Sequence, residues 1–390
     1  MVFLDIVFTD LPHAPSPGTE VWTGGMGSSP GGIANLAVAT ARLGLRTSLV
    51  AGFGDDGYAD WCRRVLADQE GVDLSLSRTF EHWHTPVTVS MAYDGDRAMV
   101  THGHPAPLTS AQLIGTPPST RAVVVELEDE PWWLPAHAAG SLVFADVGWD
   151  PSGAWHRDVL DRLDGCDCFM PDDLEAQAYT RTMTPEAGAP PPGPPVSAGA
   201  GGAASGAGPG AVLDRLAGCH CFMPNDLEAQ AYTRTETPEA ALAALANLVP
   251  MAVVTSGARG ARAIDGSTGE HAWVPSVPAT AIDPTGAGDV FGASLVVGTL
   301  AGWPLEHRLQ FSALCASLAV RQFGGALAAP GWGDLADWWA TVTPRAAAGD
   351  PAAHDLRKAY GFLPVLLPAG PAKALRSAEA TLARLSDVPP

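Results

Sequence analysis

The sequence predicts an α/β fold with a mainly parallel sheet and a β-hairpin outside it. Residues 122–127 and 141–147 are nearly continuous apolar runs, which are typical of strands buried on both faces. Strand segments alternate with helical segments along much of the chain, as they do in parallel α/β sheets. Two strand segments within residues 85–101 flank an Asp-Gly-Asp turn at 94–96, and this pattern predicts the hairpin.

Composition limits the classes of protein that this chain can represent. Its 390 residues are 46% hydrophobic, enough for the core of one large domain or two ordinary ones. The 22 basic and 42 acidic residues give a formal charge of -20, which argues against a nucleic-acid or anionic-membrane surface. The N-terminus lacks a basic secretory n-region, and no apolar run reaches the ~18 residues of a membrane span. We therefore expect a cytoplasmic protein without nucleic-acid or membrane partners.

The elements of the first hundred residues follow from periodicity and turn residues. Residues 4–8 predict a strand, and residues 36–43 predict a helix that ends at Gly44, a typical residue for that position. Residues 47–53 are apolar and rich in strand-forming residues, so we expect a second strand there. Residues 58–70 have the spacing of an amphipathic helix.

The second half of the chain continues the alternation of helices and strands. Residues 238–248 predict a helix, residues 251–255 a strand and residues 310–322 a further helix. After about residue 341 the chain becomes rich in Ala and Pro, with a predicted terminal helix at 372–385. We assign no chemistry to this tail.

A tandem duplication occupies the middle of the chain. Residues 159–187 and 212–240 differ at only four positions and are offset by 53 residues (212 − 159). Between them, residues 188–210 are mainly Pro, Gly, Ala and Ser, a composition that predicts a disordered loop. Each copy carries one Cys-x-Cys-Phe-Met strand. We expect the sheet to have one place for that strand, filled by the second copy.

The duplication repeats a pair of cysteines, Cys166 and Cys168 in the first copy and Cys219 and Cys221 in the second. Four thiolates could form a zinc site. Alternate residues of a strand share a face, however, so the same pattern is expected of thiols packed in a core. The doubling is explained by the duplication, and we expect core positions.

The stretch that suggests chemistry is Asp-Pro-Thr-Gly-Ala-Gly-Asp at residues 283–289. An apolar run at 290–300 follows it and predicts a buried helix. The start of a helix offers unpaired N–H groups and the positive end of the helix dipole, and small residues let an anion approach. Asp289 at that helix start could accept a proton from a hydroxyl. The alternative is a glycine-rich turn that only links a strand to a helix.

The lysines exclude two kinds of phosphate site. Walker loops and protein kinases place a Lys beside the phosphates. The only lysines here, Lys358 and Lys373, lie near the C-terminus, and no GxxxxGK[ST] segment is present. A phosphate site in this chain would therefore depend on backbone N–H groups, metal and Arg.

Four segments resemble motifs of the ribokinase-like (PfkB) carbohydrate kinases. DPTGAGD resembles the C-terminal signature of that family, and SPGGIANLAVATARLG at 29–44 resembles the N-terminal signature, with AGFGDDGYADWCRRVLADQEGVDLS after it. NDLEA at 225–229 is similar to the family's NxxE motif, and TSGARGA at 255–261 to its T-x-G-x-x-G loop. The four occur in the family's order.

The resemblance implies a ribokinase-like three-layer α/β/α sandwich with a mainly parallel central sheet and a small β lid. The kinase domain would comprise residues 1–340, with lid segments at about 14–24 and 85–104. Residues 341–390 would form the Ala/Pro-rich tail with its terminal helix.

The resemblance also implies roles for the matching residues. Asp289 would be the base, and the backbone N–H groups of Gly286, Ala287 and Gly288 would form the anion hole. The residues implied to bind the sugar are Asp5, Gly31, Gly32 and Asn35. Those implied on the nucleotide side are Asn225, Glu228, Thr255, Gly257 and Gly260, with Glu228 holding Mg²⁺ through water. Carbonyls near Asp283 and Thr285 would hold a monovalent cation, K⁺.

Simpler roles exist for some of these residues. Asn225 has the position of a helix N-cap, Asp5 that of a turn residue at a strand end, and Asn35 that of a cap. The chain also departs from the family, because Met1 nearly abuts the first strand and Ile33 stands where several members have Lys. We expect the natural start to lie upstream.

The function that these observations favour is ATP- and Mg²⁺-dependent phosphorylation of a sugar or sugar-like alcohol, by a protein that dimerises through its lid. A nucleoside kinase of the same family is the nearest alternative. A third reading is a sugar- or nucleotide-binding protein whose activity the duplication has impaired, depending on which copy occupies the sheet. The first copy has Asp172 at the position of Asn225. No motif supports a partner-docking role for residues 188–210.

Overall fold

In the computed structural model, the chain forms two compact units. We call residues 1–117, 258–260 and 273–390 the flanking unit, and residues 118–257 and 261–272 the central unit. The structure describes residues 1–93, 96–127, 130–148, 162–163, 165–171, 213 and 215–374. The loop predicted at 188–210 and Asp172 lie outside these ranges.

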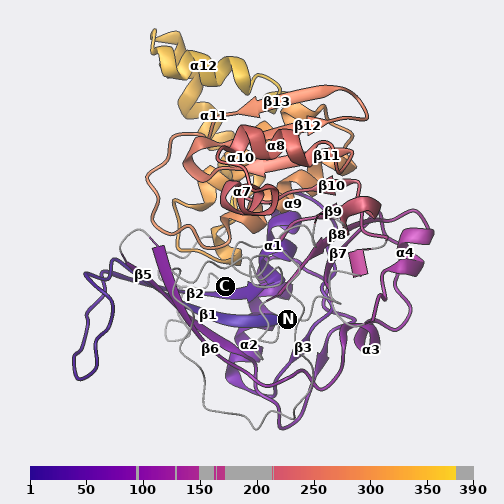
Figure 1. Ribbon diagram of the computed structural model, residues 1–390. Coiled ribbons are helices and arrows are strands. Elements are labelled where there is room, and N and C mark those ends of the chain that lie inside the picture. The colour runs from indigo at the N-terminus through magenta and orange to yellow at the C-terminus, as the bar shows by residue number, and fades with distance from the viewer. Residues whose placement is uncertain are drawn as a thin grey trace. The chain divides into compact units, whose positions relative to one another are not determined.

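The flanking unit contains a four-stranded sheet in the order β2-β1-β5-β6 (Figure 1). Its strands are β1 (Val2–Thr9), β2 (Gly25–Gly32), β5 (Val87–Tyr93) and β6 (Asp96–His102). The strand β1 pairs with β2 in the antiparallel sense and with β5 in the parallel sense. The β5–β6 hairpin therefore continues the sheet that contains the first strand, and it lies outside the mainly parallel sheet of the chain, as the sequence predicts. The predicted turn at 94–95 lies outside the described residues.

The other elements of the flanking unit are short strands and a set of helices. Strands β3 (Gly52–Phe53) and β4 (Arg78–Thr79) pair in parallel. The strand predicted at 47–53 is therefore formed only at its end, with one isolated bridge between Ser48 and Asp73 before it. The helices before residue 120 are α1 (Ala34–Arg42), α2 (Gly57–Arg64), a π-helical turn (Val65–Gln69) and α3 (Ser110–Ile114). Those after residue 280 are α9 (Ala287–Leu300), α10 (Leu305–Ala319), a 3₁₀ turn (Ala326–Ala328), α11 (Trp332–Ala347), α12 (Pro351–Ala359) and α13 (Leu363–Leu366).

Helix α9 is the apolar helix that the sequence predicts after residue 289. Its residues from Val290 to Gly298 are all buried, and it packs against α1 and α10. A helix that is apolar on every side belongs in a core. Its N-terminus is thereby held in a fixed place within the flanking unit.

The central unit contains a seven-stranded sheet in the order β13-β12-β11-β10-β9-β8-β7. Its strands are β7 (Ala122–Glu126), β8 (Leu142–Asp146), β9 (Cys168–Phe169), β10 (Cys221–Phe222), β11 (Met251–Thr255), β12 (Ala261–Asp265) and β13 (Glu270–Val274). The helical elements are α4 (Leu134–Ala138), a 3₁₀ turn (Leu216–Gly218), α7 (Asp226–Thr233), α8 (Pro238–Leu245) and a second 3₁₀ turn, Gly257–Arg259, that crosses the boundary. Strands β7 to β11 are parallel, and β12 is antiparallel to β11, which confirms the predicted fold class.

Both duplicated strands lie in this sheet, side by side, between β8 and β11 (Figure 1). They pair in parallel with Cys168 opposite Cys221 and Phe169 opposite Phe222. The two phenylalanine rings stack with their centroids 5.7 Å apart and their planes 13° from parallel. The expectation that the sheet accepts one copy is wrong, because two strands of the same sequence have the same edges and each can pair with the other.

The duplicated cysteines occupy core positions, as the sequence predicts. Cys166, Cys168, Cys219 and Cys221 are all buried and carry no disulfide. A hydrogen bond with Cys221, together with burial, raises the pKa of the Cys168 thiol well above its usual range. Such thiols stay protonated and pack as small apolar groups.

The chain beyond residue 340 is folded as far as it is described. Helix α11 runs across the predicted boundary at 340, and α12 packs against it. The predicted terminal helix at 372–385 lies almost entirely outside the described residues. Within the described part of the chain, no helix combines the length and apolar character needed to cross a bilayer.

The strand duplication leads to a prediction about the sheet. Deleting residues 172–224 joins Pro171 to Asn225 and leaves β9 between β8 and β11. Because β9 repeats the sequence of β10, we expect it to pair with both neighbours and form a six-stranded sheet. Circular dichroism and thermal unfolding should show a cooperative fold with a Tm within roughly 5 °C of the full chain. Loss of the cooperative transition would contradict the equivalence of the two strands.

Candidate active site

The flanking unit brings Asn35 and Asp289 together. The Asn35 side-chain Nδ2 donates a hydrogen bond of 2.7 Å to Asp289 Oδ2, although the two residues are 254 positions apart. Asn35 lies in the first turn of α1, and Asp289 lies in the first turn of α9. The positive ends of two helix dipoles therefore meet at this carboxylate and favour negative charge there.

Gly286 shapes the start of α9. Its φ of 75° lies in the left-handed region that glycine adopts without strain, and it precedes the helix as its N-cap. The Ala287 N–H donates to the Pro284 carbonyl at 3.1 Å, and the Val290 N–H makes the bond to Gly286 at 2.9 Å. Of the three predicted anion-hole amides, the one at Ala287 is thus already used to close the turn.

Asp5 and Gly31 approach each other across the β1–β2 pair. Asp5 lies opposite Ser29, so Gly31 is its diagonal neighbour on the same face of the sheet. A Cβ at Gly31 would lie 1.9 Å from Asp5 Oδ2, which only glycine avoids. The next residue, Gly32, has a φ of 62°, and a Cβ there would meet the Met1 carbonyl at 2.4 Å. The Gly-Gly pair therefore makes room for the carboxylate and for the turn into α1.

The environment of Asp5 raises the pKa of its carboxyl to about 7. The main cause is desolvation, because burial of the carboxyl disfavours its charged form. The negative charge of Asp283 also raises the pKa. The positive charge of Arg97 opposes both. Asp5 is thus a carboxyl that changes its charge near neutral pH.

Asp283 holds the turn before α9. The side chain is buried, and its Oδ1 accepts hydrogen bonds from the Thr285 N–H at 2.9 Å and from Thr285 Oγ1 at 2.7 Å. Its Oδ2 accepts from the Gly324 N–H at 2.9 Å, and the Thr285 carbonyl accepts from the Gly325 N–H at 3.2 Å. The carboxylate is used by the protein itself, whereas a carbonyl oxygen keeps a second lone pair that a monovalent cation could use.

Four residues of this region were not predicted from the sequence: Arg97, Ser29, Gly324 and Gly325. A Cβ at Gly325 would lie 3.0 Å from the Ser29 side chain and 3.7 Å from Asp5 Oδ2. The Gly-Gly pair at 324–325 was the available signal, because it repeats the pattern of 31–32. Arg97 gave no signal, since its approach to Asp5 depends on the pairing of three strands.

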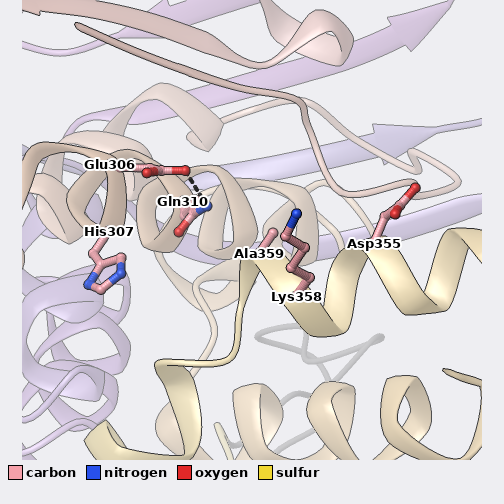
Figure 2. Close-up of a pocket in the computed structure, with 6 residues that line it drawn as sticks. All are labelled: Glu306, His307, Gln310, Asp355, Lys358 and Ala359. Atoms are coloured by element: carbon pink, nitrogen blue, oxygen red, sulfur yellow. Dashed lines mark hydrogen bonds between the residues drawn. The ribbon is translucent and has the colours of Figure 1, made fainter. Parts of the chain in front are cut away.

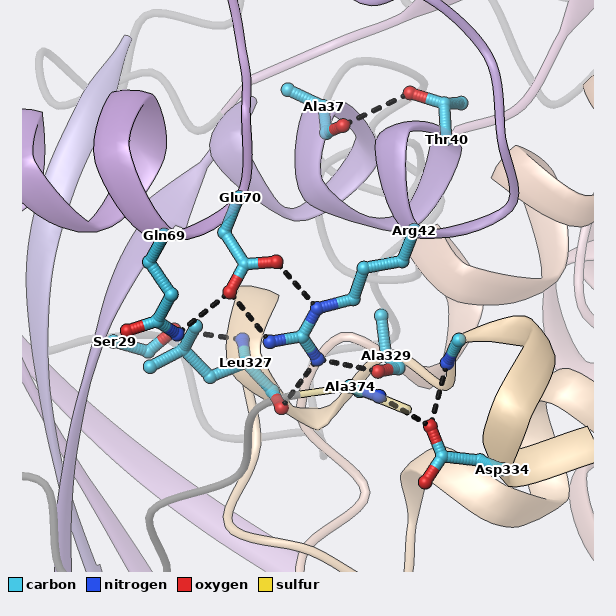
Figure 3. Close-up of polar contacts among 11 residues, drawn as sticks. Ser29, Ala37, Thr40, Arg42, Gln69, Glu70, Leu327, Ala329, Asp334 and Ala374 are labelled. Atoms are coloured by element: carbon cyan, nitrogen blue, oxygen red, sulfur yellow. Dashed lines mark hydrogen bonds and ion pairs between the residues drawn. The ribbon is translucent and has the colours of Figure 1, made fainter. Parts of the chain in front are cut away.

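A buried ion pair supports this end of the unit (Figure 3). Arg42 in α1 forms a two-pronged pair with Glu70, with both nitrogen–oxygen distances at 2.7 Å and both side chains only 4% exposed. The same guanidinium donates to the carbonyls of Leu327 and Ala329 at 3.0 and 2.6 Å. The Leu327 N–H in turn donates to Ser29 Oγ at 3.2 Å. These contacts connect α1 to the strand that lies opposite Asp5.

The predicted nucleotide residues lie mainly in the central unit. Asn225 caps α7, where its side chain accepts from the Glu228 N–H at 3.0 Å and Glu228 Oε2 accepts from the Asn225 N–H at 2.7 Å. Asn225 is also bridged to Thr255, so the C-terminal ends of β10 and β11 bring these two together. Gly257 follows with a φ of 50°. The predicted capping role of Asn225 is therefore real and does not preclude a ligand.

Gly260 belongs to the flanking unit, next to the boundary. Its φ is 92°, and a Cβ there would lie 2.0 Å from the Val274 carbonyl. This position therefore needs glycine for the local path of the chain, independently of any nucleotide.

A pocket of about 370 Å³ lies between residues of α10 and α12 (Figure 2). It is lined by Glu306, His307, Gln310, Asp355, Lys358 and Ala359. The Gln310 amide donates to Glu306 at 3.2 Å inside it. None of the predicted site residues contributes to this lining.

Comparison with known proteins agrees with the motifs. Residues 204–331 match the family model of the pfkB family carbohydrate kinases. A ribokinase of Bacillus subtilis is 39% identical over 71 residues, which cover 18% of this chain and 24% of the relative. A cytidine kinase of Thermococcus kodakarensis is 32% identical over 102 residues, 26% of this chain and 37% of the relative. The matches thus span well under half of either relative.

Solved structures show the same fold over most of the chain. A ribokinase from Cryptococcus neoformans in complex with ADP superposes with a TM-score of 0.58 at 19% identity, covering 86% of this chain and 96% of that one. An Arabidopsis thaliana ribokinase complexed with ribose and ATP gives a TM-score of 0.53 at 21% identity, covering 85% and 93%. The ribokinase-like fold predicted from the motifs is confirmed.

The close approach at Gly31 predicts the effect of a single methyl group. Gly31→Ala should displace the Asp5 carboxylate and lower the Tm by roughly 2–10 °C, as overpacking does elsewhere. Gly57→Ala is the matched control, because a Cβ at Gly57 meets nothing within 4 Å. Its Tm should stay within roughly 2 °C of the parent. Equal Tm values for the two variants would contradict the crowding at Gly31.

The raised pKa of Asp5 predicts a dependence of stability on pH. The folded chain holds the Asp5 proton up to about pH 7, whereas the unfolded chain releases it near 3.8, so this residue's contribution to stability falls between those values. The Tm of Asp5→Asn minus that of the parent should therefore grow by roughly 2–8 °C from pH 4 to pH 8. Glu20→Gln, at an exposed carboxylate of the same unit, serves as the control. Parallel Tm curves for Asp5→Asn and the parent would contradict the shift.

Proposed function

We propose that this chain, which belongs to the ribokinase-like (PfkB) family of carbohydrate kinases, transfers a phosphoryl group from ATP to a hydroxyl of a sugar or sugar-like molecule. The observation that carries the proposal is the contact between Asn35 and Asp289 at the start of α9. It puts a carboxylate, a fixed amide and the N-terminus of a buried helix at one place. A base beside an anion site is what phosphoryl transfer to an alcohol needs.

In this mechanism Asp289 accepts the proton of the attacking hydroxyl. Asn35 is its positioning residue, because the 2.7 Å hydrogen bond restricts the rotation of the carboxylate. The N–H groups of Gly286 and Gly288 face the charge that develops on the transferred phosphoryl group, assisted by the helix dipole. Ala287 serves mainly by closing the turn through Pro284.

Asp5 would bind the sugar with Gly31, Gly32 and Asn35. An ionised carboxylate accepts hydrogen bonds from two hydroxyls at once, which suits neighbouring hydroxyls of a sugar. Because the pKa of Asp5 is about 7, its carboxyl loses its proton as the pH rises through neutrality, and both oxygens can then accept hydrogen bonds.

The nucleotide side would be formed by Asn225, Thr255, Gly257 and Gly260. Mg²⁺ prefers oxygen ligands and usually keeps several waters, so the half-buried Asn225 amide fits a water-mediated contact. Glu228 is 0% exposed and uses Oε2 to hold the Asn225 N–H, which supports a positioning role on that side. When bound, Mg²⁺ would offset the phosphate charge.

For K⁺, the available donors in the turn before α9 are backbone carbonyls. The Thr285 carbonyl accepts one hydrogen bond from Gly325, and the Asp283 carboxylate, already bonded to Thr285 and Gly324, keeps the turn in shape. We therefore assign the cation to carbonyl oxygens of residues 283–285 and the carboxylate to positioning.

Nucleosides are the second candidate substrates. The cytidine kinase relative matches a longer part of this chain than the ribokinase does, 102 residues against 71. A nucleoside also presents ribose hydroxyls, so Asp5 and Asn35 could bind either class. A panel of pentoses, hexoses, sugar acids, cytidine and adenosine, assayed by ATP consumption, distinguishes them.

The role of Asp289 leads to a direct test. Asp289→Asn should lower kcat by about 10²–10⁴-fold, the usual contribution of a general base, while the KM for ATP stays within roughly threefold. Asp60→Asn, an exposed aspartate in α2, is the matched control and should leave both constants unchanged.

Two outcomes would overturn the proposal. Unchanged turnover in Asp289→Asn would show that Asp289 is not the general base. Binding of sugar or nucleotide without turnover, in the full chain and in the 172–224 deletion alike, would indicate a binding protein instead. Turnover in the deletion variant alone would show that the natural chain is impaired by the extra strand and that the site itself is competent.

A further inference from the structure

Three histidines gather at the open end of the β5–β6 hairpin. The ring centroids of His84, His102 and His104 lie 4.8 to 5.3 Å apart in all three pairs. His84 is half-buried, whereas His102 and His104 are exposed. Each ring offers one nitrogen as a ligand atom, and these three nitrogens lie within 4.8 Å of one another. The proposed phosphoryl-transfer chemistry uses none of them.

The ladder between the two strands places these rings together. His102 is the last residue of β6 and pairs with Val87, the first residue of β5. His84 lies three residues before Val87 and His104 lies two residues after His102, so the two histidines extend the paired strands at the same end. The Trp83 indole N–H donates to the Pro105 carbonyl at 3.1 Å, which keeps the chains adjacent beyond the ladder.

The backbone on both sides of His84 is anchored. Trp83 is buried, and Thr85 is fully buried with its N–H donating to Asp56 at 2.7 Å and its hydroxyl accepting from the Gly54 N–H at 3.1 Å. His84 Nδ1 lies 3.3 Å from the Thr85 carbonyl. A carbonyl only accepts, so this contact puts the proton on Nδ1 and leaves the Nε2 lone pair for a ligand.

We propose that His84, His102 and His104 bind a divalent transition-metal ion of the Zn²⁺ class. Imidazole is a preferred ligand for such ions, and nitrogen ligands at about 2.0–2.1 Å from a tetrahedral zinc are roughly 3.3 Å apart. The nitrogens need to approach one another by at most about 1.5 Å, which rotation of the two exposed side chains supplies. Three protein ligands leave one coordination position for water.

A metal ion bound there would join the segment before β5 to the segment after β6, at the open end of the hairpin. The ion would stabilise the four-stranded sheet by mass action, because the unfolded chain does not hold the three rings together. This inference does not depend on the proposed kinase activity, since it rests on residues that the mechanism leaves unused.

Calorimetric titration of ZnCl₂ into chelator-treated full-length protein, without nucleotide, tests the site. We expect one ion per chain and a rise in Tm. His102→Gln combined with His104→Gln should weaken binding by at least about tenfold and abolish the Tm rise. His271→Gln, at an exposed histidine of β13, is the matched control and should bind as the parent does.

A spectroscopic measurement separates this site from the buried cysteines. Co²⁺ bound by imidazole and water gives weak visible bands, whereas thiolate ligation adds intense charge-transfer absorption. Weak bands that disappear in the double variant support the histidine site. Thiolate absorption, or undiminished Zn²⁺ binding in a double variant with the parent's circular dichroism, would overturn it. His84→Gln provides a second variant with the same expected loss.

Discussion

The hydrogen bond between Asn35 and Asp289 is the contact on which the chemistry proposed for the flanking unit depends. It joins two helices that begin far apart in the sequence, and each helix can start there only because a glycine turn precedes it. The turn before α1 also makes room for Asp5, and the turn before α9 is held by Asp283. The proposed proton acceptor, anion site and sugar-binding carboxylate are thus positioned by one set of close backbone approaches.

The Arg42–Glu70 pair has a different task, since it fixes α1 from behind. A buried ion pair contributes little net stability, but loss of one partner leaves an uncompensated charge. Here the Arg42 guanidinium also donates hydrogen bonds to the carbonyls of Leu327 and Ala329 (Figure 3). The same guanidinium therefore joins α1 both to Glu70 and to the 326–329 segment.

Sequence reasoning predicted the parts of this structure that local pattern determines. The buried helix α9, the strands β7, β8 and β11, and the residues in the glycine turns all follow from periodicity and turn chemistry. The approach of Arg97 to Asp5 and the use of the Ala287 N–H within its own turn depend on long-range pairing and on local bond geometry. The place of the first copy's strand does not follow from local pattern, because it depends on the edges that two identical strands offer each other in the assembled sheet.

The adjacent strands β9 and β10 have a consequence for how this chain can change over time. A strand inserted beside its own duplicate meets edges that already fit, so the insertion preserves the register of every other strand. The two copies then share one structural duty, and a substitution in either strand leaves an intact counterpart next to it.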